Sequence, residues 1–346
     1  MKPSRWPRSQ PLNNRLLVID GATQSWTDAR VADLTSFLNP GDLVIVNDAA
    51  TLPAAFFART EAGDRLEVRL VNHEHGTRFL AVLLGEGNWR TRTEDRVGPP
   101  VLKTGARLQI EGSPLKAQIL ETSVLSPRSV TLEFNLDESA TWREMYRAGH
   151  PIQYSHLNGD LELWDVQTAY ASRPWAMEMP SAGKPLQWKL LLDLMRHGVN
   201  LAALTHAAGI SASGDPVLDA LLPLPERYDL PLATVEAIDS THNQGGRVIA
   251  IGTSVTRALE GNYARHGKLA AGLGMTDLIL QPGFERQIVD GILSGMHEAT
   301  ETHFRLLSCF LDESLLQAAV EHAEASGYLS HEFGDSCLIL PKTHTI

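Results

Sequence analysis

The strongest chemical signal in the sequence is a short segment in which a strand, a tight turn and a helix follow one another. Residues 247–251 read RVIAI, Gly252-Thr253-Ser254 come next, and Arg257 lies one turn into the predicted helix. Free N–H groups at a helix N-terminus bind anions, and the two hydroxyls add donors. Arg257 could hold a carboxylate with two hydrogen bonds. An ordinary capped helix with a surface arginine explains this segment alone equally well.

Two further polar groups follow predicted buried strands. The apolar run 43–46 ends at Asn47-Asp48, and His206 follows a predicted strand at 199–204. Ligands of open α/β sheets bind at the carboxyl ends of the strands. Asp48 could therefore bind ribose hydroxyls or act as an acid, or it could cap a turn. His206 suits a general base, with a histidine packed beneath a loop as the alternative.

The pattern of histidines and cysteines argues against a metal site. His73 and His75 would share one face of a strand, but no cysteine or carboxylate cluster follows them, which favours a solvated hairpin. Cys309 and Cys337 have no zinc spacing and no disulfide partner pattern, so we expect a cytoplasmic location. The N-terminus has no apolar run behind its positive charges, and no stretch is long enough to span a membrane.

The composition is that of an ordinary globular protein, with 43% hydrophobic and 21% charged residues. A formal net charge of −11 disfavours a protein whose main task is to coat nucleic acid. A local basic patch remains possible, because Arg90, Arg92 and Arg96 lie close together near Trp89. A solvated loop is the plainer interpretation of that cluster.

The elements that must position these groups fall into two kinds. Between residues 56 and 150, short runs of alternating apolar and polar residues are separated by glycines and prolines, which predicts a small antiparallel β-barrel. Residues 1–55 and 151–346 alternate strand and helix patterns, which predicts helices packed on a mainly parallel sheet. The expected architecture is therefore an α/β domain interrupted by an inserted barrel domain.

Individual elements of the α/β part are predicted from apolar spacing and from turn signals. Helices are expected at 29–38, 188–197, 255–264 and 313–326, the last one capped by Asp312. Strands are expected at 15–20, 43–46, 199–204, 247–251, 278–280 and 337–340.

Several of these segments together resemble one family. Residues 247–260, RVIAIGTSVTRALE, are similar to its RVIAVGTTSVRTLE-type segment. Other stretches agree in the same order: PGDLVIVND at 40–48, QTAYA at 167–171, PSAG at 180–183, PG at 282–283, His297, and GDSCLIL at 334–340. The family is that of the S-adenosylmethionine:tRNA ribosyltransferase-isomerases of queuosine biosynthesis, and the resemblance covers nearly the whole chain.

The resemblance implies the same two-part fold and an unusual reaction. The ribosyl part of S-adenosylmethionine is transferred and isomerised onto the aminomethyl group of a deazaguanine in tRNA, giving epoxyqueuosine and releasing adenine and methionine. S-adenosylmethionine is a substrate, and no metal is implied. The implied catalytic groups are Asp48, His206, Glu226 and His297. The implied S-adenosylmethionine-binding residues are Tyr170, Ser181, Ala182, Gly183, Gly252, Thr253, Ser254, Arg257, Pro282 and Gly283.

The chain also departs from the family pattern. Ala55 stands where the family has an arginine, Lys184 follows the PSAG segment in place of a leucine, and Leu222 lies where the family has histidines. After His297, residues 298–302 read EATET where the family has a lysine-containing LPKST, which is unfavourable for binding tRNA. Two alternatives therefore stay open. One is a divergent paralogue that uses S-adenosylmethionine with a different, possibly small-molecule, acceptor. The other is a non-catalytic S-adenosylmethionine- or nucleoside-binding protein.

Overall fold

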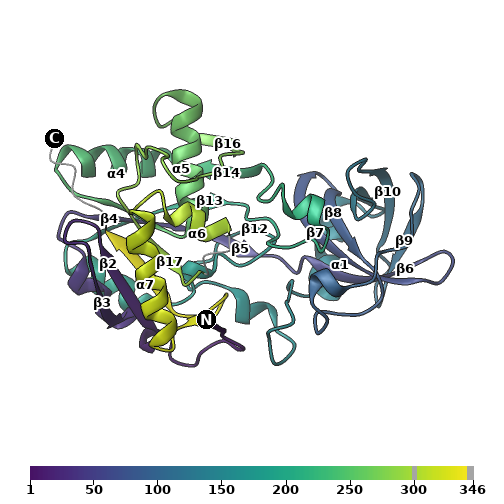
Figure 1. Cartoon of the computed structure of the whole chain (residues 1–346). Coiled ribbons are helices and arrows are strands. Elements are labelled where there is room, and N and C mark those ends of the chain that lie inside the picture. The colour runs from purple at the N-terminus through teal and green to yellow at the C-terminus, as the bar shows by residue number, and fades with distance from the viewer. Residues whose placement is uncertain (298–301, 341–346) are drawn as a thin grey trace.

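The computed structural model describes residues 1–297 and 302–340 and consists of an α/β part with a β-barrel on one side of it (Figure 1). The barrel is closed, with the strand order β10-β11-β8-β7-β6-β9, and every pairing within it is antiparallel. Its strands are β6 (Ala55–Thr60), β7 (Arg65–His75), β8 (Arg78–Leu84), β9 (Arg107–Ile110), β10 (Lys116–Thr122) and β11 (Ser129–Phe134). The predicted inserted barrel is confirmed.

The interior of the barrel explains the alternating pattern that predicted it. Leu66, Val68 and Leu70 on β7 are almost fully buried in one core with residues of the other barrel strands. The intervening Glu67 and Arg69 are also buried, so the outer face of β7 is covered too. Helix α1 (Glu138–Ala148) follows the barrel and adds Met145 to its core.

The α/β part is built on a sheet of nine strands in the order β16-β14-β13-β4-β15-β17-β19-β2-β3. The four central strands β13, β4, β15 and β17 are mutually parallel. At one edge β14 pairs antiparallel with β13 and β16, and at the other edge β3 pairs antiparallel with β2. The bounds are β2 (Arg15–Asp20), β3 (Ser25–Arg30), β4 (Leu43–Asn47), β13 (Asn200–His206), β14 (Glu226–Leu230), β15 (Val248–Ile251), β16 (Gly272–Thr276), β17 (Gly291–Gly295) and β19 (Ser336–Leu340). The predicted fold class is confirmed, with a parallel centre in a mixed sheet.

Helices cover both faces of this sheet, which explains why β4 is apolar at successive positions. Leu43 and Ile45 pack in a core with the helices α4 (Leu232–Asn243), α5 (Thr253–His266) and α7 (Glu313–Ala325). Val44 and Val46 point to the opposite face and pack against helix α2 (Trp188–Arg196). Among the described residues, no helix is both long and apolar enough to cross a membrane.

The remaining elements are short. Two pairs of parallel strands lie outside the main sheet and the barrel: β5 (Ala49–Thr51) with β12 (Arg173–Ala176), and β1 (Lys2–Pro3) with β18 (Leu329–Ser330). The short helices are α3 (Pro216–Asp219), α6 (Thr302–Leu307) and the 3-10 turns η1 (Pro11–Asn13), η2 (Val31–Phe37), η3 (Thr93–Asp95), η4 (Leu163–Val166) and η5 (Ser181–Gly183).

Three local predictions are wrong. Residues 278–280 form no strand, because the carbonyl of Leu278 accepts a hydrogen bond from Arg257 Nε at 2.9 Å instead of joining a sheet. The strand lies earlier, at β16, where Gly274 leaves room for the ring of Tyr228. Residues 31–37 form a 3-10 helix rather than an α-helix. Asp312 occupies the N-cap of α7, but its side chain makes no capping hydrogen bond.

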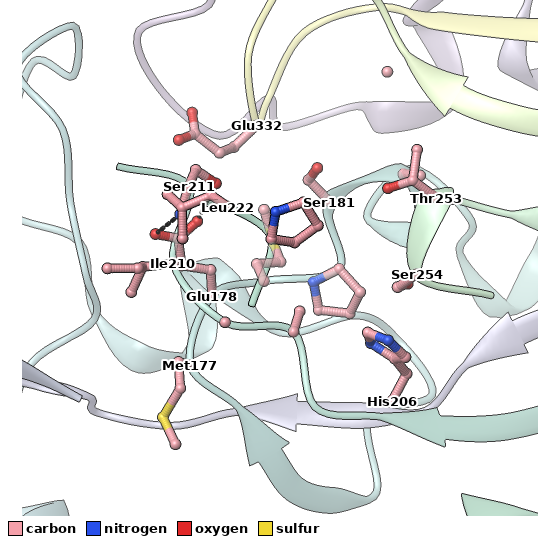
Figure 2. Close-up of a pocket in the computed structure, with 18 of the residues that line it drawn as sticks. Met177, Glu178, Ser181, His206, Ile210, Ser211, Leu222, Thr253, Ser254 and Glu332 are labelled. Carbon is pink, nitrogen blue, oxygen red and sulfur yellow. Dashed lines mark hydrogen bonds between the residues drawn. The ribbon is translucent and has the colours of Figure 1, made fainter. Parts of the chain in front are cut away.

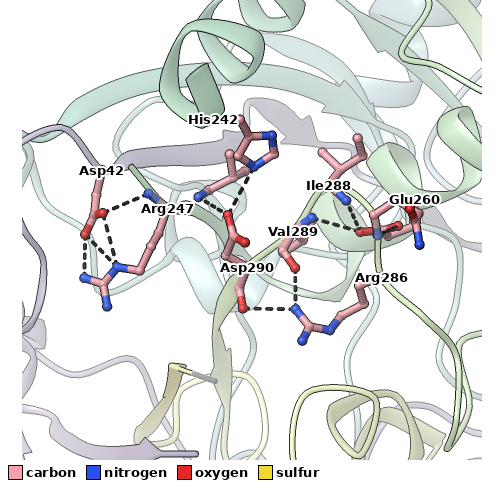
Figure 3. Close-up of polar contacts among 10 residues, drawn as sticks. Asp42, His242, Arg247, Glu260, Arg286, Ile288, Val289 and Asp290 are labelled. Atoms are coloured by element: carbon pink, nitrogen blue, oxygen red, sulfur yellow. Dashed lines mark hydrogen bonds and ion pairs between the residues drawn. The ribbon is translucent and has the colours of Figure 1, made fainter. Parts of the chain in front are cut away.

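Two carboxylates, the buried Asp42 and the partly exposed Asp290, hold the amino ends of the central strands in place (Figure 3). Asp42, before β4, accepts hydrogen bonds from the backbone N–H of Asn39 at 2.8 Å and of Arg247 at 3.0 Å. It also forms an ion pair with the Arg247 guanidinium. Asp290, before β17, accepts the N–H of Val248, the first residue of β15, at 2.8 Å. Each carboxylate therefore ties one strand to its neighbour.

We predict that Asp42→Asn lowers the free energy of unfolding by about 2–4 kcal/mol, since it leaves the Arg247 guanidinium without its carboxylate. This loss of stability is slightly smaller than the loss expected on breaking a fully buried ion pair, because the Arg247 side chain is 19% exposed, whereas that of Asp42 is 2% exposed. Urea denaturation measures the change. Asp193→Asn, which removes a surface pair with Lys189 and Arg196, is the matched control and should lower the free energy of unfolding much less. Equal losses in both variants would contradict the role given to Asp42.

Candidate active site

A cavity of about 390 Å³ lies where the carboxyl ends of β13 and β15 meet the segments that connect the two parts of the chain. This volume is within the usual range for small-molecule sites. Nine of the residues predicted from the sequence line it: Ser181, Ala182, His206, Glu226, Gly252, Thr253, Ser254, Arg257 and His297. Figure 2 shows Thr253, Ser254 and His206 on one side of the cavity and Glu178, Ser211 and Glu332 on the other.

The N-terminus of α5 forms one end of the cavity. Gly252 is the N-cap and has a φ of 90°, a conformation that favours glycine, and its carbonyl accepts a bond from the Thr256 hydroxyl. Its N–H donates a hydrogen bond of 2.8 Å to the Leu293 carbonyl of β17, which fixes the turn against the sheet. Thr253 and Ser254 follow on the cavity wall. The first turn of this helix therefore presents N–H groups and hydroxyls to a ligand.

Arg257 and Glu226 form a buried ion pair beside that turn. Arg257 Nη1 contacts Glu226 Oε2, and its Nε donates to the Leu278 carbonyl at 2.9 Å. Glu226 also accepts the backbone N–H of Gly209 at 2.7 Å. Arg257 Nη2 is buried without a hydrogen-bond partner in the described part of the chain. Two nitrogens of the guanidinium are therefore held in place, and the third has no partner among the described residues. Arg257 itself lines the cavity.

His206 is the third member of this group and is fully buried. Its Nε2 lies 3.4 Å from Glu226 Oε2, and neither ring nitrogen makes a hydrogen bond to a described residue. Its backbone is fixed by Asn47, whose side chain accepts the His206 N–H at 2.9 Å and donates to the His206 carbonyl at 3.0 Å. Burial, with a smaller effect of the Arg257 charge, lowers the pKa of His206 to about 4. The ring is therefore uncharged at neutral pH, and its role as a base stays a prediction.

His297 follows the carboxyl end of β17 and also lines the cavity. Its Nε2 lies 3.2 Å from the Ser294 hydroxyl oxygen. The altered acidic positions 298–301 that follow it lie outside the described residues. Ser181 and Ala182 belong to η5, and the Ala182 side chain packs close to Gly252.

Five predicted residues are not among those that line the cavity: Asp48, Tyr170, Gly183, Pro282 and Gly283. Asp48 accepts a hydrogen bond from the Thr205 hydroxyl at 2.6 Å. Gly183 lies against Tyr170, so close that a Cβ there would come within 2.0 Å of the Tyr170 hydroxyl. Burial, together with the Asp48 charge, raises the pKa of Tyr170. A direct role for these five residues stays a prediction.

Sequence reasoning missed the far wall of the cavity, which contains Tyr154, Glu178, Ser211 and Glu332. All four lie outside helices and regular strands, so no periodic pattern marks them. One signal was available, because Glu178 is a lone charge between Met177 and Met179 directly before the PSAG segment.

A second group of polar side chains lies next to that wall. The ligand atoms of His156, His331 and Glu332 all lie within 4.8 Å of one another, a set that could hold a metal ion. His156 Nε2 contacts Glu332 Oε2 at 2.8 Å, and the rings of His156 and His331 stack with their centres 4.3 Å apart. The expectation that no metal is needed stays a prediction.

Comparisons with known proteins agree with this geometry. A family model described as queuosine biosynthesis protein matches residues 4–339. The chain belongs to this family. The S-adenosylmethionine:tRNA ribosyltransferase-isomerase of Trichlorobacter lovleyi is 30% identical over 97% of this chain and 96% of its own length. That of Gloeobacter violaceus is 31% identical over 98% and 94%. The resemblance inferred from the sequence is therefore confirmed.

A solved structure supports the fold of this family member. The S-adenosylmethionine tRNA ribosyltransferase from Thermotoga maritima matches with a TM-score of 0.54 at 23% identity, covering 98% of this chain and 96% of the other. At this identity the likeness concerns the fold and not the details of the site.

We predict that His206 makes stability depend on pH in the acidic range. The pKa of His206 is about 4 in the folded protein against 6.5 for an ordinary histidine, so the unfolded chain binds one more proton between these values. The contribution of the buried neutral ring to the stability of the folded protein is fully present above pH 6.5. The free energy of unfolding falls by about 1.4 kcal/mol per pH unit as the pH drops from 6.5 towards 4.

Denaturation at a series of pH values tests this. His206→Gln should remove this part of the slope, whereas His75→Gln, at an exposed position on β7, should leave the slope unchanged. The interpretation fails if wild type and His206→Gln have parallel profiles between pH 6.5 and 4.

Proposed function

We propose that this protein is an S-adenosylmethionine-dependent ribosyltransferase-isomerase. It transfers and isomerises the ribosyl part of S-adenosylmethionine onto the aminomethyl group of a deazaguanine in tRNA, gives epoxyqueuosine, and releases adenine and methionine in the cytoplasm. The observation that carries the proposal is that the family match spans residues 4–339 and that nine of the residues named from the family's motifs line one cavity.

The methionine end of the substrate fits the α5 end of the cavity. Its carboxylate meets the free N–H groups and hydroxyls at Thr253 and Ser254 and the unused Nη2 of Arg257. Because Nη1 and Nε of Arg257 are already engaged, the arginine offers one nitrogen rather than a two-pronged clamp. Glu226 holds the guanidinium in position through Nη1, and a carboxylate at Nη2 would satisfy a buried donor that has no partner among the described residues.

The chemistry needs a base that is uncharged before the reaction. The sulfonium makes the neighbouring ribose carbon acidic, and the neutral His206 ring takes that proton. Glu226 Oε2, at 3.4 Å from His206 Nε2, stabilises the imidazolium that forms. The acceptor amine bonds to the anomeric carbon as the bond to adenine breaks, with His297 placed to protonate the departing base. Methionine leaves as the sulfide when the epoxide closes.

One observation supports a second candidate function, which differs from the first in its acceptor. The basic cluster predicted near Trp89 is neutralised, since Arg90 pairs with Asp160, Arg92 with Glu94, and the buried Arg96 with Glu67. With a net charge of −11, this leaves less positive surface for tRNA phosphates than a tRNA enzyme is expected to carry. A paralogue that uses the same reaction on a small-molecule amine is the second candidate.

The function is tested by the products. Incubation with S-adenosylmethionine and tRNA that carries aminomethyl-deazaguanine should release adenine and methionine in equal amounts and add the epoxide-bearing sugar to the tRNA. If adenine appears only with the free aminomethyl-deazaguanine base, the small-molecule candidate is correct. If S-adenosylmethionine raises the melting temperature but no acceptor releases adenine, the protein is a binding protein. No stabilisation at millimolar concentration would remove S-adenosylmethionine as its ligand.

We predict that His206→Gln lowers kcat by about 10²–10⁴-fold, which is the usual value of a positioned acid–base group. Glutamine keeps a hydrogen bond but cannot take up a proton at neutral pH. Affinity for S-adenosylmethionine should change much less, because the lost interaction belongs to the transition state. Single-turnover kinetics with saturating substrate measure the effect. Near-normal turnover in this variant would make His206 a packing residue and leave His297 as the base.

A further inference from the structure

The wall of the cavity opposite α5 carries an acidic group built on Glu178. Its Oε1 accepts the backbone N–H of Ser211 at 3.1 Å and contacts the Tyr154 hydroxyl, and its Oε2 accepts the Ser211 hydroxyl at 2.5 Å. Glu332 lines the same wall, and in Figure 2 it lies above Ser211 and Glu178. These contacts fix the Glu178 carboxylate at the cavity surface.

No cation pairs with Glu178 among the described residues, for its partners are two hydroxyls and one N–H. Burial raises the pKa of Glu178, and the Glu332 charge raises it further. Glu332 differs, because its contact with His156 at 2.8 Å helps to lower its own pKa against the effect of burial. The wall thus holds two acids near one another, and one of them lacks a counter-charge.

The other charged groups near Glu178 do not supply that counter-charge. Arg305 lines the same cavity, but no ion pair joins it to Glu178 among the described residues. Arg69 lies behind the Tyr154 ring, with its guanidinium 5.4 Å from the ring centre. Arg69 is paired with Glu67 at 2.7 Å, and its attraction to Glu178 is a minor influence on its own pKa. His156 and His331 stack against each other beside Glu332. A positively charged ligand group in the cavity would balance Glu178.

We propose that Glu178, together with Glu332, is the subsite for the protonated amine of the acceptor, and that Glu178 takes one proton from the ammonium. The ammonium becomes a neutral amine whose lone pair forms the new bond to the anomeric carbon, and the proton moves to the Glu178 carboxylate. This proposal rests on the proposed function and names the group of the acceptor that this wall recognises.

The other cationic groups of the reaction belong elsewhere. The ammonium of the methionine end shares a carbon with its carboxylate, so it stays at the α5 end beside Thr253 and Ser254. The sulfonium lies between that end and the ribose, near His206. Figure 2 shows Glu178 and Glu332 across the cavity from these residues. The acceptor amine is the cation left for the far wall.

The test is Glu178→Gln, which keeps the shape of the side chain and one oxygen to accept from the Ser211 N–H and the Tyr154 hydroxyl, but not its charge. The Ser211 hydroxyl, which donates to Glu178 Oε2, would instead accept from the glutamine amide. We expect the KM for free aminomethyl-deazaguanine, and for tRNA that carries it, to rise by about 10–100-fold, as expected for a lost charge-assisted hydrogen bond. The affinity for S-adenosylmethionine, measured by calorimetric titration, should change by less than about threefold. Glu162→Gln, at an exposed position that is not part of the cavity lining, is the matched control and should change neither value.

A pH profile separates proton transfer from simple binding. In the wild type, kcat/KM for the amine should fall at acidic pH as Glu178 becomes protonated, and Glu178→Gln should lack this acid limb. Glu332→Gln provides a second route if Glu178→Gln fails to fold. Loss of the Glu332 charge lowers the pKa of Glu178, so the acid limb should move to lower pH.

The outcomes distinguish this inference from the function on which it rests. If wild type binds S-adenosylmethionine and releases adenine with either acceptor, but both variants keep the wild-type KM and acid limb, the subsite is wrong and the function stands. If the wild type releases no adenine with either acceptor, the proposed function fails. A rise in KM for the free base but not for the tRNA would show that the subsite recognises a small-molecule amine.

Discussion

The arrangement of the site depends on carboxylates placed at the opposite end of the sheet. Asp42 and Asp290 accept N–H groups at the amino ends of β15 and its neighbours, and Asp42 also holds the Arg247 guanidinium (Figure 3). These bonds set the stagger of β4, β15 and β17 relative to one another. Each strand then ends at a fixed position: Gly252 reaches the cavity from β15, and Asn47, at the end of β4, holds the backbone of the cavity residue His206. A slip of one residue in either strand would turn its side chains to the opposite face. Glu260 adds to this frame by accepting the N–H groups of Gln287, Ile288 and Val289.

Sequence reasoning succeeded where one physical rule dominates. The run Leu43–Val46 packs against helices on both faces and must be apolar throughout, so its pattern identifies a buried strand. The glycine at position 252 and the residues after it form a turn and helix whose geometry follows from local rules, and they line the cavity as expected. The barrel was predictable for the same reason, since one face of each strand points into a closed core.

The failures have a physical reason as well. Residues 278–280 look like a strand because they are apolar, yet they form part of the cavity wall, and the Leu278 carbonyl is bound by Arg257. The far wall comes from loops, where Tyr154, Glu178 and Ser211 meet through contacts between segments distant in the chain. The uncharged state of His206 depends on burial beside Arg257, which no local pattern reveals. Tertiary contacts determine each of these features.

The way the chain passes between its two parts has a further consequence. It leaves the α/β part before Ala55 and returns at His150, and these two residues pair with each other through hydrogen bonds of 3.0 and 2.9 Å. No residue of the barrel strands lines the cavity, although Thr51 and Pro151, on either side of the junction, do. Entry and exit are therefore adjacent, which is the arrangement that tolerates domain insertion. Because the barrel strands contribute nothing to the cavity lining, substitutions within them can accumulate without changing the residues that surround the ligand.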